Sequence, residues 1–140
     1  MINFRSLRKK GKLLEALIET TNPDMIMGTK TWLDPNIKSS EYQHFDIARR
    51  DRPSDPHGGV IIIAKKGLHL RDASLSKNLE MISGTIKLEG RKKMVLVTYY
   101  RPSHQTDETI NRLCKQKIMK LRNKHRKEIF VLEEILAFPI

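Results

Sequence analysis

Residues 58–64 read Gly-Gly-Val-Ile-Ile-Ile-Ala, and this stretch decides the expected fold. The five residues after the glycine pair are apolar without a break, and four of them are β-branched. Such a run favours a strand that is buried on both faces. A strand of this kind lies in the interior of a layered domain, so the glycine pair is interpreted as the turn that leads into it.

Further strands are predicted on both sides of this run. Residues 25–29 are short and apolar, and residues 45–49 are a further candidate. Residues 80–89 alternate, with Ile82, Gly84, Ile86 and Leu88 on one face, and residues 94–100 follow as a strong candidate. Residues 2–4 are interpreted as the end of a first strand and residues 129–132 as a last one.

Two helices complete the pattern. The first covers residues 11–20, where Leu13, Leu14, Leu17 and Ile18 share one face, and Asn22-Pro23-Asp24 ends it. The second runs from a cap at Asp107 to about Lys127. Its apolar stripe contains Ile110, Leu113, Cys114, Ile118 and Leu121. The order of elements predicts a mixed α/β layered domain.

The positive charge is concentrated in two places. The chain of 140 residues has 27 Lys and Arg against 16 Asp and Glu, a net charge of +11. Residues 5–12 and 112–127 together hold thirteen of the basic residues and no acidic one. Such a field attracts polyanions, of which nucleic acid is the commonest inside cells. A solvated helix face remains open for the second run, as does a membrane-surface helix, although its stripe lacks Trp and Phe.

Several classes of protein are excluded or disfavoured. The longest apolar run is far shorter than the ~20 residues of a transmembrane helix. The N-terminus shows no secretory signal, and the single Cys114 rules out an internal disulfide and a multi-cysteine zinc site. We therefore expect an intracellular protein, with the nucleus as one compartment, and no obligate protein partner can be read from the sequence.

Five short motifs in order resemble the endonuclease domains of LINE-type (non-LTR) retrotransposon polyproteins. The resemblance extends from Asn3 to about Leu132. The matching stretches are Asn3-Phe4-Arg5-Ser6-Leu7, Thr29-Lys30-Thr31-Trp32-Leu33, Arg50-Asp51-Arg52, Gly58-Gly59-Val60 and Tyr99-Tyr100-Arg101-Pro102. This family is part of the endonuclease/exonuclease/phosphatase superfamily. The resemblance implies a partial domain over residues 1–140, the N-terminal part of a four-layered α/β sandwich similar to DNase I.

The resemblance also implies a chemistry. Family members hydrolyse phosphodiesters with a divalent metal, usually Mg²⁺, which prefers carboxylate and amide oxygens. Asn3 matches a residue of the family's metal site, and Tyr100 matches a tyrosine that contacts the reacting phosphate. These two are the predicted catalytic residues. Lys30 stands where the family has a metal-binding Glu, and an ammonium offers no lone pair to a cation.

A second departure follows the last predicted strand. The family reads Gly-Gly-Asp-Phe-Asn there, whereas residues 133–140 contain neither that Asp nor that Asn. The family's later Ser-Asp-His, which carries the general base, is expected to lie beyond the end of this chain. The resemblance therefore implies a truncated, degenerate copy without a complete metal site. It is expected to supply mainly one of the two family sheets, so that the inner apolar face of that sheet stays uncovered.

The predicted function is accordingly a retrotransposon-derived endonuclease-like domain, by descent a metal-dependent DNA nuclease and inactive in this chain. The alternative is a non-catalytic, basic nucleic-acid-binding module. A phosphatase or phosphodiesterase of the same superfamily is a third interpretation. DNA or another nucleic acid is the expected partner. Its expected contacts are Arg5, Arg101, Lys115, Lys120, Arg122 and Lys124.

Overall fold

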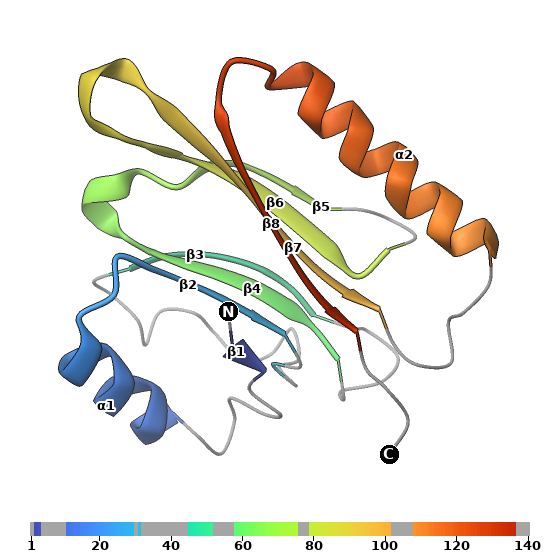
Figure 1. Ribbon diagram of the computed structural model, residues 1–140. Helices are drawn as coiled ribbons and strands as arrows, with labels where there is room; N and C mark the ends of the chain where they lie inside the picture. Colours follow the sequence, from blue (N-terminus) through green and yellow to red (C-terminus); the bar gives the residue numbers. More distant parts are fainter. Residues whose placement is uncertain are drawn as a thin grey trace.

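The fold is a four-layered α/β sandwich. It is seen in a computed structural model that describes residues 2–3, 11–29, 31, 45–51, 58–75, 79–101 and 108–136. Two four-stranded sheets lie face to face. Helix α1 (Gly11–Thr21) lies outside one sheet, and helix α2 (Glu108–Lys124) lies outside the other (Figure 1). The predicted fold class, the N-terminal part of a sandwich similar to DNase I, is confirmed.

The first sheet, called sheet A, is built around the apolar run that begins at Val60. Its strand order is β1 (Ile2–Asn3), β2 (Met25–Thr29), β4 (Val60–Lys65) and β3 (Phe45–Arg50). β1 is parallel to β2, whereas β4 is antiparallel to both of its neighbours. Every residue from Val60 to Ala64 is buried, which confirms a strand covered on both faces.

Alternation along β4 divides its side chains between two cores. Ile62 faces the second sheet, in a cluster that includes Ile82 and Leu96 from that sheet. Ile61 and Ile63 point the other way and pack against Leu14 of α1. The contact between the sheets is therefore a continuous apolar core and not an exposed face.

The second sheet, called sheet B, has the order β5 (Arg71–Leu75), β6 (Met81–Lys87), β7 (Lys93–Arg101) and β8 (Ile129–Leu136). Its outer face packs against α2 through a cluster that includes Met81, Val95 and Cys114. The expectation of mainly one sheet with an uncovered inner face is wrong. β5 and β8 complete a second sheet, and this sheet covers the first.

Three other details differ from the sequence prediction. β5 was not predicted, because Arg71-Asp72-Ala73-Ser74-Leu75 has no β-branched residue and its pairing with β6 shifts register. α2 ends at Lys124, where a turn through His125 begins. Leu113 was predicted within the apolar stripe of α2, but it lies at the edge of this stripe and is 37% exposed, whereas Cys114 is buried.

Candidate functional site

The ends of six strands meet at one end of the sandwich, which we call the strand-end site. In sheet A, Asn3 pairs with Thr29, and both Thr29 and Arg50 pair with Val60. The carboxyl ends of β1, β2 and β3 therefore lie beside the start of β4. In sheet B, the start of β6 lies beside the end of β7, because Met81 pairs with Tyr99.

A buried carboxylate joins the two sheets at this end. The backbone N–H of Gly59, just before β4, donates to Glu80 Oε1 at 2.5 Å. The carbonyl of Glu80 accepts the N–H of Tyr100 in β7 at 3.0 Å. Glu80 is only 9% exposed. We call this arrangement of Gly59, Glu80 and Tyr100 the Glu80 bridge. A buried carboxylate needs a hydrogen-bond donor, and Gly59 supplies it. Because Glu80 also binds Tyr100 through its backbone carbonyl, the bridge fixes β4, β6 and β7 relative to one another.

Only glycine fits at the sheet A side of the bridge. Gly59 has φ of +100°, a conformation that side chains rarely adopt. A Cβ at this position would lie 2.3 Å from Thr31 Oγ1 and 3.3 Å from the carbonyl oxygen of Arg50. The hydroxyls of Thr29 and Thr31 are buried here and have no hydrogen-bond partner among the described residues. Gly59 thus allows a close approach of chain segments, which the sequence did not indicate.

The two predicted catalytic residues lie on the two sheets at this end. Asn3 is the last residue of β1, and its backbone pairs with Thr29. Tyr100 lies near the end of β7, is buried, and packs in the core between the sheets. Lys30 lies outside the described residues, as does the side chain of Asn3. The catalytic roles of Asn3 and Tyr100 therefore stay predictions.

The described residues do not fit a magnesium site. No group of three or more His, Cys, Asp or Glu side chains converges within the part of the chain that the structure describes. The buried carboxylate of Glu80 accepts a hydrogen bond from Gly59. Lys30 occupies the position that resembles the family's metal-binding Glu. A hard divalent cation prefers several oxygen ligands, and the described donors do not supply them.

β8 continues through the position where the family has Gly-Gly-Asp-Phe-Asn. The strand extends to Leu136 instead of ending near Leu132. Its last four residues pair in parallel register with Thr98 to Arg101 of β7, and Arg101 lies opposite Leu136. In this chain the segment is therefore committed to the sheet by its backbone.

The predicted nucleic-acid contacts on α2 divide into two groups. Lys115, Lys120 and Lys124 are exposed. Arg122 instead lies over the ring of Phe130, 5.5 Å from its centroid, and its Nη1 donates to the carbonyl oxygen of Glu128 at 3.3 Å. Arg122 thus helps to dock α2 on β8. Arg5 and the side chain of Arg101 lie outside what the structure describes.

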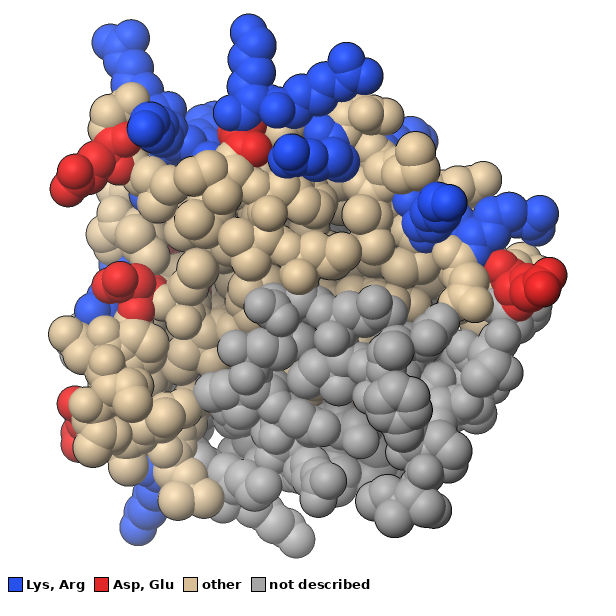
Figure 2. All heavy atoms as spheres, in the orientation of Figure 1, with Lys and Arg blue, Asp and Glu red and all other residues tan. Residues whose placement is uncertain are grey.

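Basic side chains gather on one side of the molecule. Figure 2 shows Lys and Arg along the upper edge, over α2 and the turn between β6 and β7. Lys117 and His125 were not among the predicted contacts, although Lys117 lies three and seven residues before Lys120 and Lys124, on the same side of the helix. Within the described residues, no helix is long and apolar enough to cross a membrane.

Similarity to known proteins is seen at the level of structure. No family model matches the sequence, and none of the curated proteins matches it. A 3'-5' exonuclease, NExo, from Neisseria meningitidis has a TM-score of 0.70 and 13% identity over 95% of this chain and 55% of its own. The human Nocturnin catalytic domain has a TM-score of 0.66 and 11% identity over 91% and 56%.

A third similar structure is the endonuclease domain of TRAS1, a telomere-specific non-LTR retrotransposon. It has a TM-score of 0.60 and 14% identity, and the match covers 95% of this chain and 57% of that one. The chain thus spans about half the length of these structures. It shares the α/β sandwich fold of these structures, one of which is a retrotransposon endonuclease domain of the type that its motifs resemble.

Proposed function

We propose that this chain is an endonuclease-like domain of retrotransposon descent that binds nucleic acid without cleaving it. The fold and the ordered motifs support the descent. Among the similar structures are the TRAS1 endonuclease domain and a Neisseria 3' phosphatase, NExo, bound to product DNA hairpin. The net charge of +11 supports a polyanionic partner.

The observation that carries the loss of catalysis is the set of donors at the strand-end site. Phosphodiester hydrolysis of this type needs a metal to polarise the phosphate and to stabilise the leaving oxygen. The described residues provide two largely buried carboxylates at this end: Glu80 accepts the N–H of Gly59, and Asp51, directly after β3, forms an ion pair with Arg49 at 3.2 Å. Lys30 stands at the position where the family that the motifs resemble has a metal-binding Glu, and its ammonium repels a cation. Nucleic-acid binding does not require these groups.

The test is nicking of supercoiled plasmid. With Mg²⁺ or Mn²⁺ we expect no more relaxed circles than in a control without protein. Lys30→Glu is expected to stay at this background, because it restores one ligand and not the Asp-x-Asn pair. Nicking that increases with the amount of protein and disappears with EDTA would show that the chain is an active nuclease.

A further inference from the structure

We propose that the groove along the flank of α2 is a binding track for a single nucleic-acid strand, separate from the strand-end site. This inference deepens the proposed function and rests on it, because it names the surface that holds the nucleic acid. The groove lies on the outer side of sheet B, where α2 packs, and not between the two sheets (Figure 1). It consists of two adjoining hollows that share Lys117 and Lys120.

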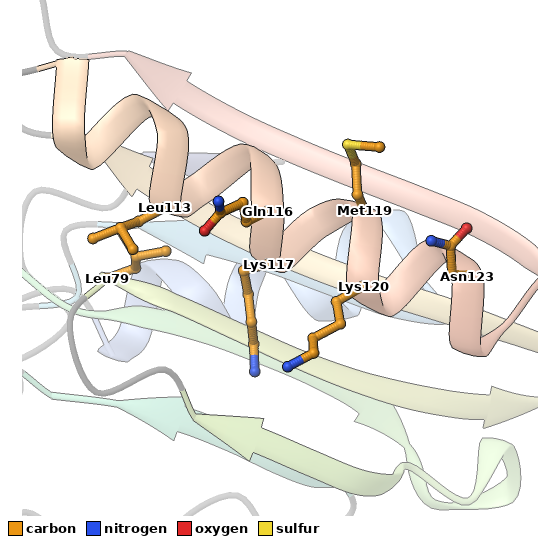
Figure 3. A pocket seen from close by; sticks show the side chains of 7 residues that line it. All are labelled: Leu79, Leu113, Gln116, Lys117, Met119, Lys120 and Asn123. Carbon is orange, nitrogen blue, oxygen red and sulfur yellow. The ribbon is translucent and has the colours of Figure 1, made fainter.

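The hollow nearer the strand-end site combines apolar and polar groups. Its volume is about 550 Å³, and its lining comes from Leu79, Leu113, Gln116, Lys117, Met119, Lys120 and Asn123. In Figure 3 the side chains of Lys117 and Lys120 extend from α2 beside each other, and Leu79 lies next to Leu113. Leu113 and Met119 are 37% and 55% exposed. Apolar side chains can pack against the face of a base, and the lysines beside them can bind its phosphate.

The second hollow is more strongly basic. It measures about 320 Å³ and lies between α2 and the outer face of β6. Lys117, Lys120 and Lys124 line it with His125, and β6 adds the residues Ser83 and Thr85. Among the described residues that line either hollow there is no carboxylate. Ammonium groups are donors for phosphate oxygens, whereas the buried hydroxyl of Thr85 donates to the carbonyl oxygen of Arg71.

The spacing of the lysines matches an extended ligand. Lys117, Lys120 and Lys124 are three and four residues apart, so they form one row on the helix about 10 Å long. A third basic hollow, at the far end of sheet B, is lined by Arg91, Lys92, Lys93 and Lys127 together with Glu128. The positive side chains thus continue past the end of α2 (Figure 2).

The chemistry favours a single strand over a duplex. A duplex presents its phosphates on the outside and keeps its base faces stacked. Its base faces therefore cannot contact Leu113 and Met119. A single strand offers both a charged backbone and unstacked base faces to the same groove. The geometry therefore assigns the row formed by Lys117, Lys120 and Lys124 to phosphates and the apolar residues to bases.

The experiment compares two variants that lose the same charge. The groove variant carries Lys117→Gln, Lys120→Gln and Lys124→Gln. The control carries Lys12→Gln, Lys66→Gln and Lys87→Gln, which are exposed and line neither hollow. Binding of fluorescein-labelled oligothymidylate of 15 nucleotides is measured by anisotropy at several salt concentrations. We expect the groove variant to lose at least tenfold in affinity, and the control less than threefold.

The salt dependence gives a second readout. Each phosphate contact on a single strand contributes about −0.7 to the slope of log affinity against log salt, so loss of three contacts makes the slope shallower by about 2. The double variant Gln116→Glu with Asn123→Asp keeps side-chain shape and places two carboxylates in the groove. This double variant is expected to weaken the binding of the same oligonucleotide. Its thermal unfolding temperature, compared with that of the unaltered protein, checks that the fold is kept.

Each contrary result is distinct. Equal binding by the groove variant and the control overturns the track but leaves nucleic-acid binding in place. Tripolyphosphate that competes as strongly as the oligonucleotide would show a site for free phosphate instead of a strand. Preferential, groove-dependent binding to phosphatidylglycerol vesicles would assign the groove to a membrane. No binding of any strand overturns both proposals, whereas plasmid cleavage overturns only the loss of catalysis.

Discussion

At the scale of single residues, the Glu80 bridge depends on a backbone conformation that only glycine adopts easily. Gly59→Ala would place a methyl group against Thr31 Oγ1 and force alanine to a φ of +100°. We expect a loss of about 2–5 kcal/mol in the free energy of unfolding, from overpacking and backbone strain together. Urea unfolding followed by circular dichroism measures it.

Two further variants isolate the cause. Gly67→Ala is the control, because a Cβ there meets no atom within 4 Å. It should change stability by less than about 1 kcal/mol. Adding Thr31→Ala to Gly59→Ala should recover part of the loss, because it removes the hydroxyl that the new methyl meets. Equal stability of Gly59→Ala and Gly67→Ala would show that the close approach does not exist.

The sequence could indicate the glycine pair but not its partner. Gly58-Gly59 before an apolar strand is typical of a turn, and this local feature was predicted. Glu80 lies 21 residues further along the chain, and nothing in its neighbourhood marks it as the acceptor for Gly59. Sequence patterns report the contacts of residues near one another, whereas contacts between sheets depend on the packing of the whole fold.

At the scale of elements, α2 docks on sheet B by one face. Leu121 packs against the cluster around Cys114, whereas Met119 is 55% exposed. Leu121→Ala is therefore expected to lower the free energy of unfolding by about 2 kcal/mol, and Met119→Ala by less than about 1. Both variants remove a large apolar side chain from the same helix. If the two losses are equal, α2 does not pack as described.

Elements with a clear pattern of apolar residues could be predicted from the sequence, and elements without such a pattern could not. The apolar residues of α2 and the run from Val60 to Ala64 gave the right type of structure and nearly the right bounds. β5 lies at the edge of sheet B, where a strand pairs with only one neighbouring strand. This explains why its sequence has no apolar pattern. The extension of β8 to Leu136 follows from its pairing with β7, a contact that residues 133–136 alone do not specify.

At the scale of the whole molecule, the two sheets share one core and should unfold together. Ile62 from sheet A and Leu96 from sheet B are both fully buried in the cluster between the sheets. Because each inner face is covered by the other, loss of one sheet would expose the apolar face of its partner. We expect a single transition that does not depend on protein concentration.

Substitutions on either side of this core test the shared unfolding. Ile62→Ala and Leu96→Ala should each cost about 2–5 kcal/mol, whereas Leu13→Ala, at a side chain 66% exposed on α1, should cost less than about 1. In hydrogen exchange, Ile62→Ala should reduce the protection of amides in β4 and β7 by similar factors, although only β4 is altered. Loss of protection in sheet A with sheet B unchanged would mean that the sheets are independent units. The shared core would then not be what holds the sandwich together.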